Sequence, residues 1–410
     1  MHPILWVHVF LKKTMKNSTF QISQTRVRLV FSIVLVSTFF IGCKKRGCLD
    51  PNATNYDSQA QVEDNSCTYA DFQRAEMLEN LCDNYIVPAY NNFNSQISNL
   101  KDITTAFSDE RTVENFVAVR SQWREALLSW QDVSFIDFGP AEFIVLKNQV
   151  NLFPVDTSLI KSNIALGGYN LDYSSNNVAK GFQALDFLLN QPNLTDQEHV
   201  NYFVSNDDAT AYIIDISTNL LANSQSVVDS WSTYRSNFKD NNSSNAAGSS
   251  VSNLVNGLCS YYETYIRKGK IGLPLGIFNG FSQQEMPELV ECYFYGQSLP
   301  FAYRAVESMK KYINGQSYSN NNEGLGLDDY MDHVGASSGN NNLSVEINNQ
   351  IDEILTNLLA INDPLSNEIL TNKDEVTTCY SKLQELVPLM KVDMTSALGV
   401  LITYQDNDGD

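Results

Sequence analysis

Gln183 and Asp186 are the residues whose types and spacing most directly suggest chemistry. They lie three positions apart in Gly181-Phe182-Gln183-Ala184-Leu185-Asp186, so a helix would project both from one face. Phe182, Leu185 and the apolar residues 187–189 surround them. Because an unpaired polar group is costly in apolar surroundings, such a pair needs hydrogen-bond partners or a ligand. The pair is therefore the first candidate for a binding or catalytic site.

Glu288 and Glu291 form a second pair with the same spacing, in a segment predicted to be helical from Met286 to Tyr295. If they faced Gln183 and Asp186 from another helix, the four side chains would form an oxygen-rich cluster like those that helix bundles use for metals. Amide and carboxylate oxygens suit calcium or magnesium better than zinc. The alternative is that one glutamate faces solvent and the other forms a salt bridge with Arg304.

Further polar residues on otherwise apolar helices are expected at an interface between two halves of the protein: Arg124, Arg304, Asp393 and Ser396. The predicted ligand or metal site therefore draws on Gln183, Asp186, Glu288, Glu291, Arg124, Arg304 and Ser396. Its expected occupant is a divalent or iron ion, or a small polar ligand.

The histidines argue against zinc. Only His199 and His333 lie beyond position 43, and neither belongs to a His cluster or an H-E-x-x-H helix. His199 stands in a polar run and is predicted at the surface, and His333 is predicted on a surface helix. The sequence contains no G-x-S-x-G nucleophile elbow. Neither a zinc site nor serine nucleophilic catalysis is supported.

Residues 1–43 are interpreted as a lipoprotein signal. Arg26 and Arg28 precede an apolar run from Leu29 to Ile41, which is followed by Gly42 and Cys43. This pattern predicts cleavage before Cys43 and lipidation of its sulfur. A transmembrane helix is the alternative, but the run is shorter than the roughly 20 residues that a bilayer requires.

Charge narrows the range of partners. The formal net charge is −20, and removal of residues 1–43 takes away five basic and no acidic residues, which leaves −25. Such a chain repels nucleic acid. Lys44 and Lys45 follow the lipid anchor without acidic neighbours, which favours the outer membrane with the protein facing the periplasm. The expected partners are the membrane, a small ligand or metal, and envelope transport proteins.

Residues 44–69 are predicted to form a small module closed by a Cys48–Cys67 disulfide, because the segment is too small and polar to fold otherwise. It resembles short cysteine-bounded modules of exported proteins from Bacteroidetes-type bacteria. Its Asp and Asn side chains either bind calcium or make the turns of a stapled spacer. The pairing of Cys82, Cys259, Cys292 and Cys379 stays open.

The rest of the chain has helical periodicity. Apolar residues recur at three- and four-residue spacing from Phe72 to Leu100, and Trp123 and Trp130 are predicted core residues of the next helix. A polar segment at 240–250 divides the body. The fold class is therefore predicted as all-α, with two fused helical bundles at 70–239 and 251–410.

Six segments in order resemble landmarks of the imelysin family: Ile86–Tyr90, Trp123–Ala126, Ile136–Pro140, Gly181–Leu189, Lys270–Gly276 and Leu398–Thr403. The resemblance implies an exported protein of two helical bundles. The family includes proteins described as metallopeptidases and others described as iron-regulated. Its G-x-H-x-x-E signature, with His and Glu proposed as metal ligands, is altered here to Gly181, Gln183 and Asp186.

The altered signature leaves three functions open. The first is a lipid-anchored protein that binds a metal or small polar ligand between its two halves, in iron or metal uptake. The second is a metallopeptidase with an altered metal site. The third is a structural envelope lipoprotein in which Gln183 and Asp186 are relics.

Overall fold

The computed structural model describes residues 44–405 apart from residues 50, 52, 69 and 321. The predicted signal at 1–43, with the lipidation site Cys43, lies outside the described residues. The chain divides into two units, Met1–Asp71 and Phe72–Asp410. None of the helices in the described part combines the length and apolar character needed to cross a membrane.

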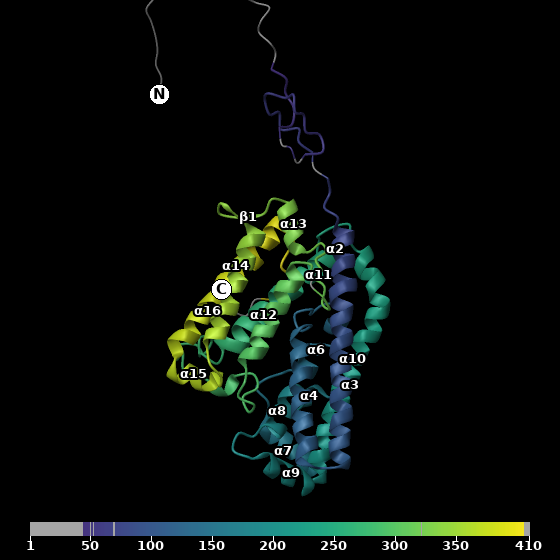
Figure 1. Ribbon diagram of the computed structural model, residues 1–410, viewed down its shortest axis with the longest axis vertical. Coiled ribbons are helices and arrows are strands. Elements are labelled where there is room, and N and C mark those ends of the chain that lie inside the picture. Colours follow the sequence, from purple (N-terminus) through teal and green to yellow (C-terminus); the bar gives the residue numbers. More distant parts are fainter. Residues whose placement is uncertain (1–43, 50, 52, 69, 321, 406–410) are drawn as a thin grey trace, which may run out of the picture. The chain divides into compact units, whose positions relative to one another are not determined.

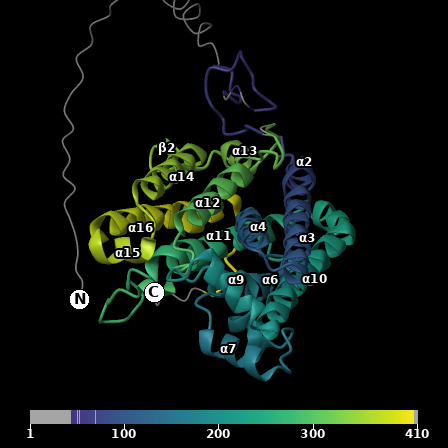
Figure 2. The same ribbon diagram turned by 60° about the horizontal axis from the view of Figure 1, so that its bottom comes forward.

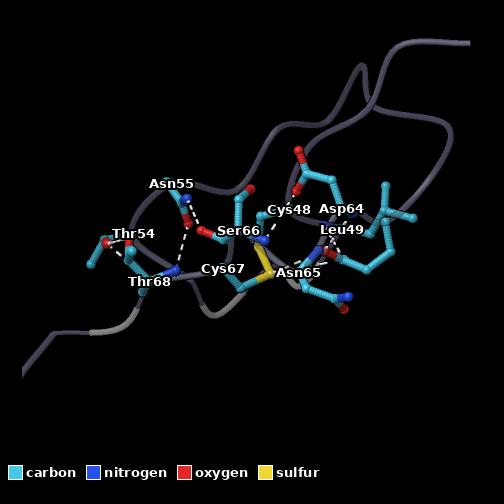
Figure 3. Close-up of a disulfide and its surroundings, with 10 residues drawn as sticks. Cys48, Leu49, Thr54, Asn55, Asp64, Asn65, Ser66, Cys67 and Thr68 are labelled. Atoms are coloured by element: carbon cyan, nitrogen blue, oxygen red, sulfur yellow. Dashed lines mark hydrogen bonds between the residues drawn. A yellow bond between two sulfur atoms is a disulfide. The ribbon is translucent and has the colours of Figure 1, made fainter.

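The first unit contains the predicted module, and its Cys48–Cys67 disulfide is confirmed (Figure 3). Asn55 ties the two sides of the loop together, since its Oδ1 accepts the Thr68 N–H at 2.8 Å and its amide donates to the Ser66 carbonyl at 2.5 Å. Asp64 Oδ1 accepts the Ser66 N–H at 3.0 Å. Asp64 thus supports a turn, and Asn55 cross-links the loop.

Long helices of the second unit form the first bundle (Figure 1). Its first long helix is continuous and consists of α2 (Arg74–Asn80), a π-helical stretch (Leu81–Ile86) and α3 (Val87–Asp109). Helix α3 packs against both α4 (Val113–Gln131) and α10 (Asp207–Asp240), and Figure 2 shows the three side by side. The predicted apolar stripe is confirmed, because Phe93, Ile97 and Leu100 are fully buried.

Shorter helices join α4 to α10. They are α5 (Pro140–Phe143), α6 (Leu146–Val150), α7 (Thr157–Leu166), a 3-10 turn (Ser174–Ala179), α8 (Gly181–Leu189) and α9 (Asp196–Val204). Helix α9 starts at a capping box in which Thr195 and Glu198 exchange hydrogen bonds. Helix α8 packs against α4, α6 and α10.

The second bundle begins with α11 (Ser250–Tyr261), which continues as a π-helical stretch (Tyr262–Gly272). Its main layers are α12 (Leu299–Ile313), α14 (Leu343–Ala360) and α16 (Lys373–Pro388). The remaining elements are a 3-10 turn (Pro287–Leu289), α13 (Leu327–His333), β1 (Ser337–Ser338), β2 (Asn341–Asn342), α15 (Leu365–Thr371), a second π-helical stretch (Leu389–Met394) and α17 (Thr395–Leu398). The strands form a minimal antiparallel pair with Ser337 opposite Asn342.

The two bundles share α12, which packs against α14 on one side and against α4 on the other. The prediction of an all-α protein with two fused helical bundles is confirmed. The segment predicted to separate them is itself packed, since Arg74 Nε donates to the Asn242 carbonyl at 2.9 Å and Asn245 Nδ2 donates to the Leu398 carbonyl at 2.6 Å.

Two local predictions are wrong. Residues 286–295 were expected to form a helix, but only Pro287–Leu289 makes a 3-10 turn, after which the chain is extended at Val290 and has a φ of 57° at Cys292. His199 was expected at the surface, yet it is 2% exposed. Its ring stacks on Phe116, and its Nε2 accepts the Gln191 N–H at 3.1 Å. Burial lowers the pKa of His199, which favours the neutral ring.

Candidate functional site

Gly181 places the motif helix. Its φ of 74° lies in the left-handed region, and a Cβ added there would meet the Val150 carbonyl oxygen at 2.4 Å. Only glycine therefore lets α8 begin so close to the end of α6. This close approach sets the position of α8, and with it the positions of the Gln183 and Asp186 side chains in the core.

Gln183 is 3% exposed and spans from α8 to the irregular segment after Leu289. Its Oε1 accepts the backbone N–H of Cys292 at 2.9 Å. Its Nε2 donates to Asn151 Oδ1 at 2.9 Å and approaches Cys292 Sγ at 3.6 Å. Both ends of the amide are therefore used by protein groups.

Asp186 holds the same segment two residues further on. Its Oδ2 accepts the Phe294 N–H at 3.0 Å, and its Oδ1 accepts the Tyr295 N–H at 2.9 Å and the Asn190 amide at 3.2 Å. Burial raises the pKa of this carboxyl to about 7; these three donors lower it, and the nearby Glu291 charge raises it. Asp186 is thus a buried hydrogen-bond acceptor, and its negative charge is stabilised by two backbone N–H groups and one side-chain amide rather than by a cation.

Glu291 lies at the centre of a buried polar network and is 1% exposed. Its Oε1 accepts the side-chain amides of Asn151 at 2.7 Å and Gln131 at 3.3 Å. Its Oε2 forms an ion pair with Lys270, which is also buried. The alternative expectation for this pair, that one glutamate faces solvent and the other forms a salt bridge, therefore holds, but the partner of Glu291 is Lys270 and not Arg304.

Three of the four predicted oxygen ligands therefore meet. Asn151 forms hydrogen bonds with both Gln183 and Glu291, and the negative charge of Glu291 is close enough to raise the pKa of Asp186. Glu288 stays exposed and lines a separate cavity of about 190 Å³, which also borders Gln183 and Asp186.

The donor set does not fit a metal ion. A cation would have to displace the Cys292, Phe294 and Tyr295 N–H groups from their acceptors, and the Lys270 ammonium already occupies Glu291. Across the described residues, Cys48, Glu63 and Cys67 are the only group of three or more acidic, cysteine and histidine side chains whose ligand atoms come within metal-binding distance of one another. The disulfide uses both of those sulfurs.

Nucleophilic chemistry fares no better at this place. Cys292 is fully buried, and burial raises the pKa of its thiol, which suppresses the reactive thiolate. Cys82, Cys259 and Cys379 are likewise buried free thiols. The arrangement around Gln183 and Asp186 is therefore a clamp on residues 292–295, and this name is used for it below.

A larger cavity of about 680 Å³ lies between α3, α4, α12 and the end of α14. Arg304 lines it and forms an ion pair with the buried Asp132, through Nε at 2.6 Å and Nη2 at 3.1 Å. Asp132 also accepts the hydroxyls of Ser308 at 2.6 Å and Tyr318 at 3.0 Å. Arg304 was predicted at the interface of the halves, and the cavity places it there.

The Tyr318 loop reaches the cavity because of a proline. Pro88 has no N–H to give to the carbonyl of Asn84, four residues earlier. The Tyr318 N–H donates to that carbonyl at 2.8 Å. The phenol then reaches Asp132 and receives the Asn92 amide at 2.7 Å.

The other predicted site residues lie elsewhere. Arg124 pairs with Glu125 at 2.8 Å and lines a different hollow beside Phe294 and Tyr295. Ser396 is exposed on α17, and Asp393 is half-buried just before it. Neither Ser396 nor Asp393 lines one of the two cavities described above.

Sequence reasoning missed Asp132, Lys270 and Tyr318. Lys270 carried a usable signal, because it follows a long apolar helix and a lysine buried there must find a carboxylate. Asp132 had a weaker one, since it lies two residues after the core residue Trp130, at the C-cap of the same helix. Tyr318 lies in a polar loop and gave none.

The comparisons with known proteins bear on the family and the fold. The imelysin family model (peptidase M75) matches residues 86–390. Iron-regulated protein A of Synechococcus elongatus is 25% identical over 159 residues, which are 38% of this chain and 40% of that protein. The chain thus matches about two fifths of the length of this curated relative.

Two solved structures share the fold. A Parabacteroides distasonis protein assigned as an iron-regulated protein A precursor superposes with a TM-score of 0.67 at 17% identity, over 84% of this chain and all of that one. An imelysin-like protein from Psychrobacter arcticum gives 0.61 at 18% identity, over 81% and 97%. At these identities the likeness shows the fold alone. Because the family model covers most of the two-bundle unit, in which the altered signature forms the clamp, the chain belongs to the imelysin family.

Proposed function

We propose that this protein is a ligand-binding member of its family and has no peptidase activity, with the ligand held in the 680 Å³ cavity between the two bundles. The observation that carries the proposal is the state of the signature residues. Every polar atom of Gln183 and Asp186 already has a protein partner, whereas the larger cavity offers free volume.

Peptide hydrolysis at the signature would need an activated water and a group to polarise the scissile carbonyl. Gln183 has no basic nitrogen, and Asp186 is engaged by the N–H groups of Phe294 and Tyr295. The clamp therefore supports a structural role in joining α8 to the second bundle.

The cavity has the features of a small-molecule site. Its volume falls within the range of roughly 300–1,000 Å³ that such sites occupy. Apolar side chains, among them Leu299 and Leu358, share its lining with a few fixed polar groups around Asp132. The Arg304–Asp132–Tyr318 network holds those polar groups in place.

Location and regulation are part of the proposal. The signal pattern ending at Cys43 supports lipid anchoring at the outer membrane, facing the periplasm. The relative's name, iron-regulated protein A, supports a response of this protein's abundance to iron supply. A part in iron or metal uptake is proposed as the purpose of that response. Immunoblots of membrane fractions from iron-replete and iron-starved cells test both points.

Peptidase activity is tested on unfolded casein, with wild type beside a Gln183→His, Asp186→Glu double variant. We expect no cleavage by wild type, with or without a chelator. Cleavage by wild type that a chelator abolishes would overturn the proposal.

Ligand binding is tested by native mass spectrometry of protein purified from its own envelope. We expect a bound small molecule in wild type and in Leu128→Met, which keeps the volume of this cavity-lining side chain. Leu128→Trp should lose it, because the indole fills the cavity. An unchanged ligand load in Leu128→Trp would place the ligand elsewhere.

A further inference from the structure

We infer that the ligand of the large cavity is a small organic cation, such as a compound with amino groups on a short alkyl chain; this inference rests on the ligand-binding function proposed above. The lining contains four carboxylates and one guanidinium: Glu125, Asp132, Glu307 and Asp363 against Arg304. The cavity wall therefore carries an excess of three formal negative charges.

Arg304 cannot neutralise this excess. Its Nε and Nη2 lie on Asp132, and its Nη1 lies 3.0 Å from Glu307. The guanidinium thus cancels the charge of Asp132 and is shared with Glu307. An anionic ligand would have to compete with both carboxylates for it.

In the described part of the chain, two carboxylates of the lining, Asp363 and Glu125, have no ion-pair partner that itself lines the cavity. Asp363 accepts the N–H groups of Ser298 at 3.0 Å and Leu365 at 3.2 Å, but it has no ion pair among the described residues. Burial raises the pKa of Asp363, which a neighbouring cation would reverse. Glu125 has a side chain that is 53% exposed, and it pairs only with Arg124, which is not part of the lining.

The rest of the wall selects an organic cation over a bare metal ion. Within the described residues, no three carboxylates of this cavity converge closely enough to coordinate one ion together. Its apolar surface comes from Leu128, Leu299, Pro300, Leu358, Leu359 and Ile361. Tyr303 and Tyr318 add two aromatic rings, whose faces attract ammonium groups. An alkyl amine matches both the apolar and the acidic parts.

Isothermal titration calorimetry on the purified protein tests the inference with spermidine as the cation, glutarate as an anion, 1,5-pentanediol as a neutral molecule and magnesium as a bare ion. Of these four probes, we expect only spermidine to show saturable binding. Glu125→Gln should weaken it about tenfold, which corresponds to 1.4 kcal/mol. Glu114→Gln, an exposed change on the same helix outside the cavity, should leave it unchanged.

The outcomes separate this inference from the proposed function. If spermidine binds equally to wild type, Glu125→Gln and Leu128→Trp, it binds only the acidic surface, and the inference is wrong. If the envelope-purified protein carries an anionic or neutral molecule that Leu128→Trp removes, the cation inference fails while the ligand-binding function stands. If no probe binds and no ligand is carried, both fail.

Discussion

The backbone N–H of Cys292 donates to Oε1 of Gln183 at 2.9 Å, across 109 positions of the chain. This bond holds Cys292 at a φ of 57°, a conformation that non-glycine residues rarely adopt. Asp186 accepts the backbone N–H groups of Phe294 and Tyr295, which follow Cys292 in the same segment. The residues that occupy the ligand positions of the family signature thus fasten the second bundle onto α8.

Replacement of Gln183 by leucine should lower the stability of the second unit. The change removes the acceptor of the buried Cys292 N–H and the partner of Asn151. Each buried group left unpaired costs about 1–3 kcal/mol, so for these two groups we expect a loss of roughly 2–6 kcal/mol in urea unfolding.

Glu288→Leu is the control for that change, because Glu288 is exposed beside the same cavity. It should shift the free energy of unfolding by no more than about 0.5 kcal/mol. Equal effects of the two substitutions would show that Gln183 does not act as a clamp.

Asp186 should make the free energy of unfolding decrease as the pH rises from about 4 to about 7. Its pKa is about 7 when folded and near 3.8 when unfolded, so the folded state binds the proton more tightly in this window. The difference corresponds to roughly 4 kcal/mol, lost progressively up to pH 7 and constant above it.

Asp186→Asn removes this titration and isolates its contribution. Urea unfolding at pH 4.5 and 7.5 should show a smaller drop in the free energy of unfolding for the variant than for wild type, while exposed Glu288→Gln keeps the wild-type drop. Subtraction of the two profiles cancels other groups, such as the buried His199. Parallel profiles for wild type and Asp186→Asn would contradict the raised pKa.

Gly181→Ala should be far more damaging than the same change at Gly168. Both glycines have positive φ, 74° and 66°, so each substitution carries the backbone strain of about 1 kcal/mol. Only at Gly181 would the new Cβ also meet the Val150 carbonyl, at 2.4 Å, whereas nothing lies within 4 Å at Gly168. Thermal unfolding should therefore show a loss of at least 3 kcal/mol for Gly181→Ala.

If the two alanine variants unfold at the same temperature, α8 can move away from α6 at no cost. The clamp would then tolerate a shift of its supporting helix, and Gly181 would have no special role.

Local periodicity predicted the helices well because their apolar stripes follow from spacing alone. Trp123 and Trp130, seven residues apart, are buried as expected, and Trp123 Nε1 donates to the Phe182 carbonyl at 3.0 Å. The Cys48–Cys67 pair also followed from local sequence. The helices depend on neighbours within a few turns, and the disulfide depends on one short segment whose cysteines are 19 positions apart.

The clamp could not be predicted in the same way. Residues 286–295 have helical spacing of their glutamates, but bonds from Gln183 and Asp186, over 100 positions away, decide their conformation. His199 was misplaced for a related reason: its polar neighbours suggested solvent, whereas its ring stacks on Phe116 of α4, far away in the sequence. Long-range polar contacts leave no periodic trace in the sequence.

Lys270→Met should destabilise the protein by about 3–5 kcal/mol, because it leaves the carboxylate of Glu291 buried without its counter-charge. Lys373→Met is the matched control and should have a much smaller effect, since the lysine and its partner Glu285 are both partly exposed and solvent screens their attraction. Adding Glu291→Gln to Lys270→Met should restore part of the loss, because an amide keeps an oxygen for Asn151 and Gln131 without burying a charge.

Chemical denaturation of Lys270→Met, Glu291→Gln, the double variant and the control completes a double-mutant cycle. A double variant less stable than Lys270→Met would mean that Glu291 stabilises the core without Lys270, through its amide partners alone.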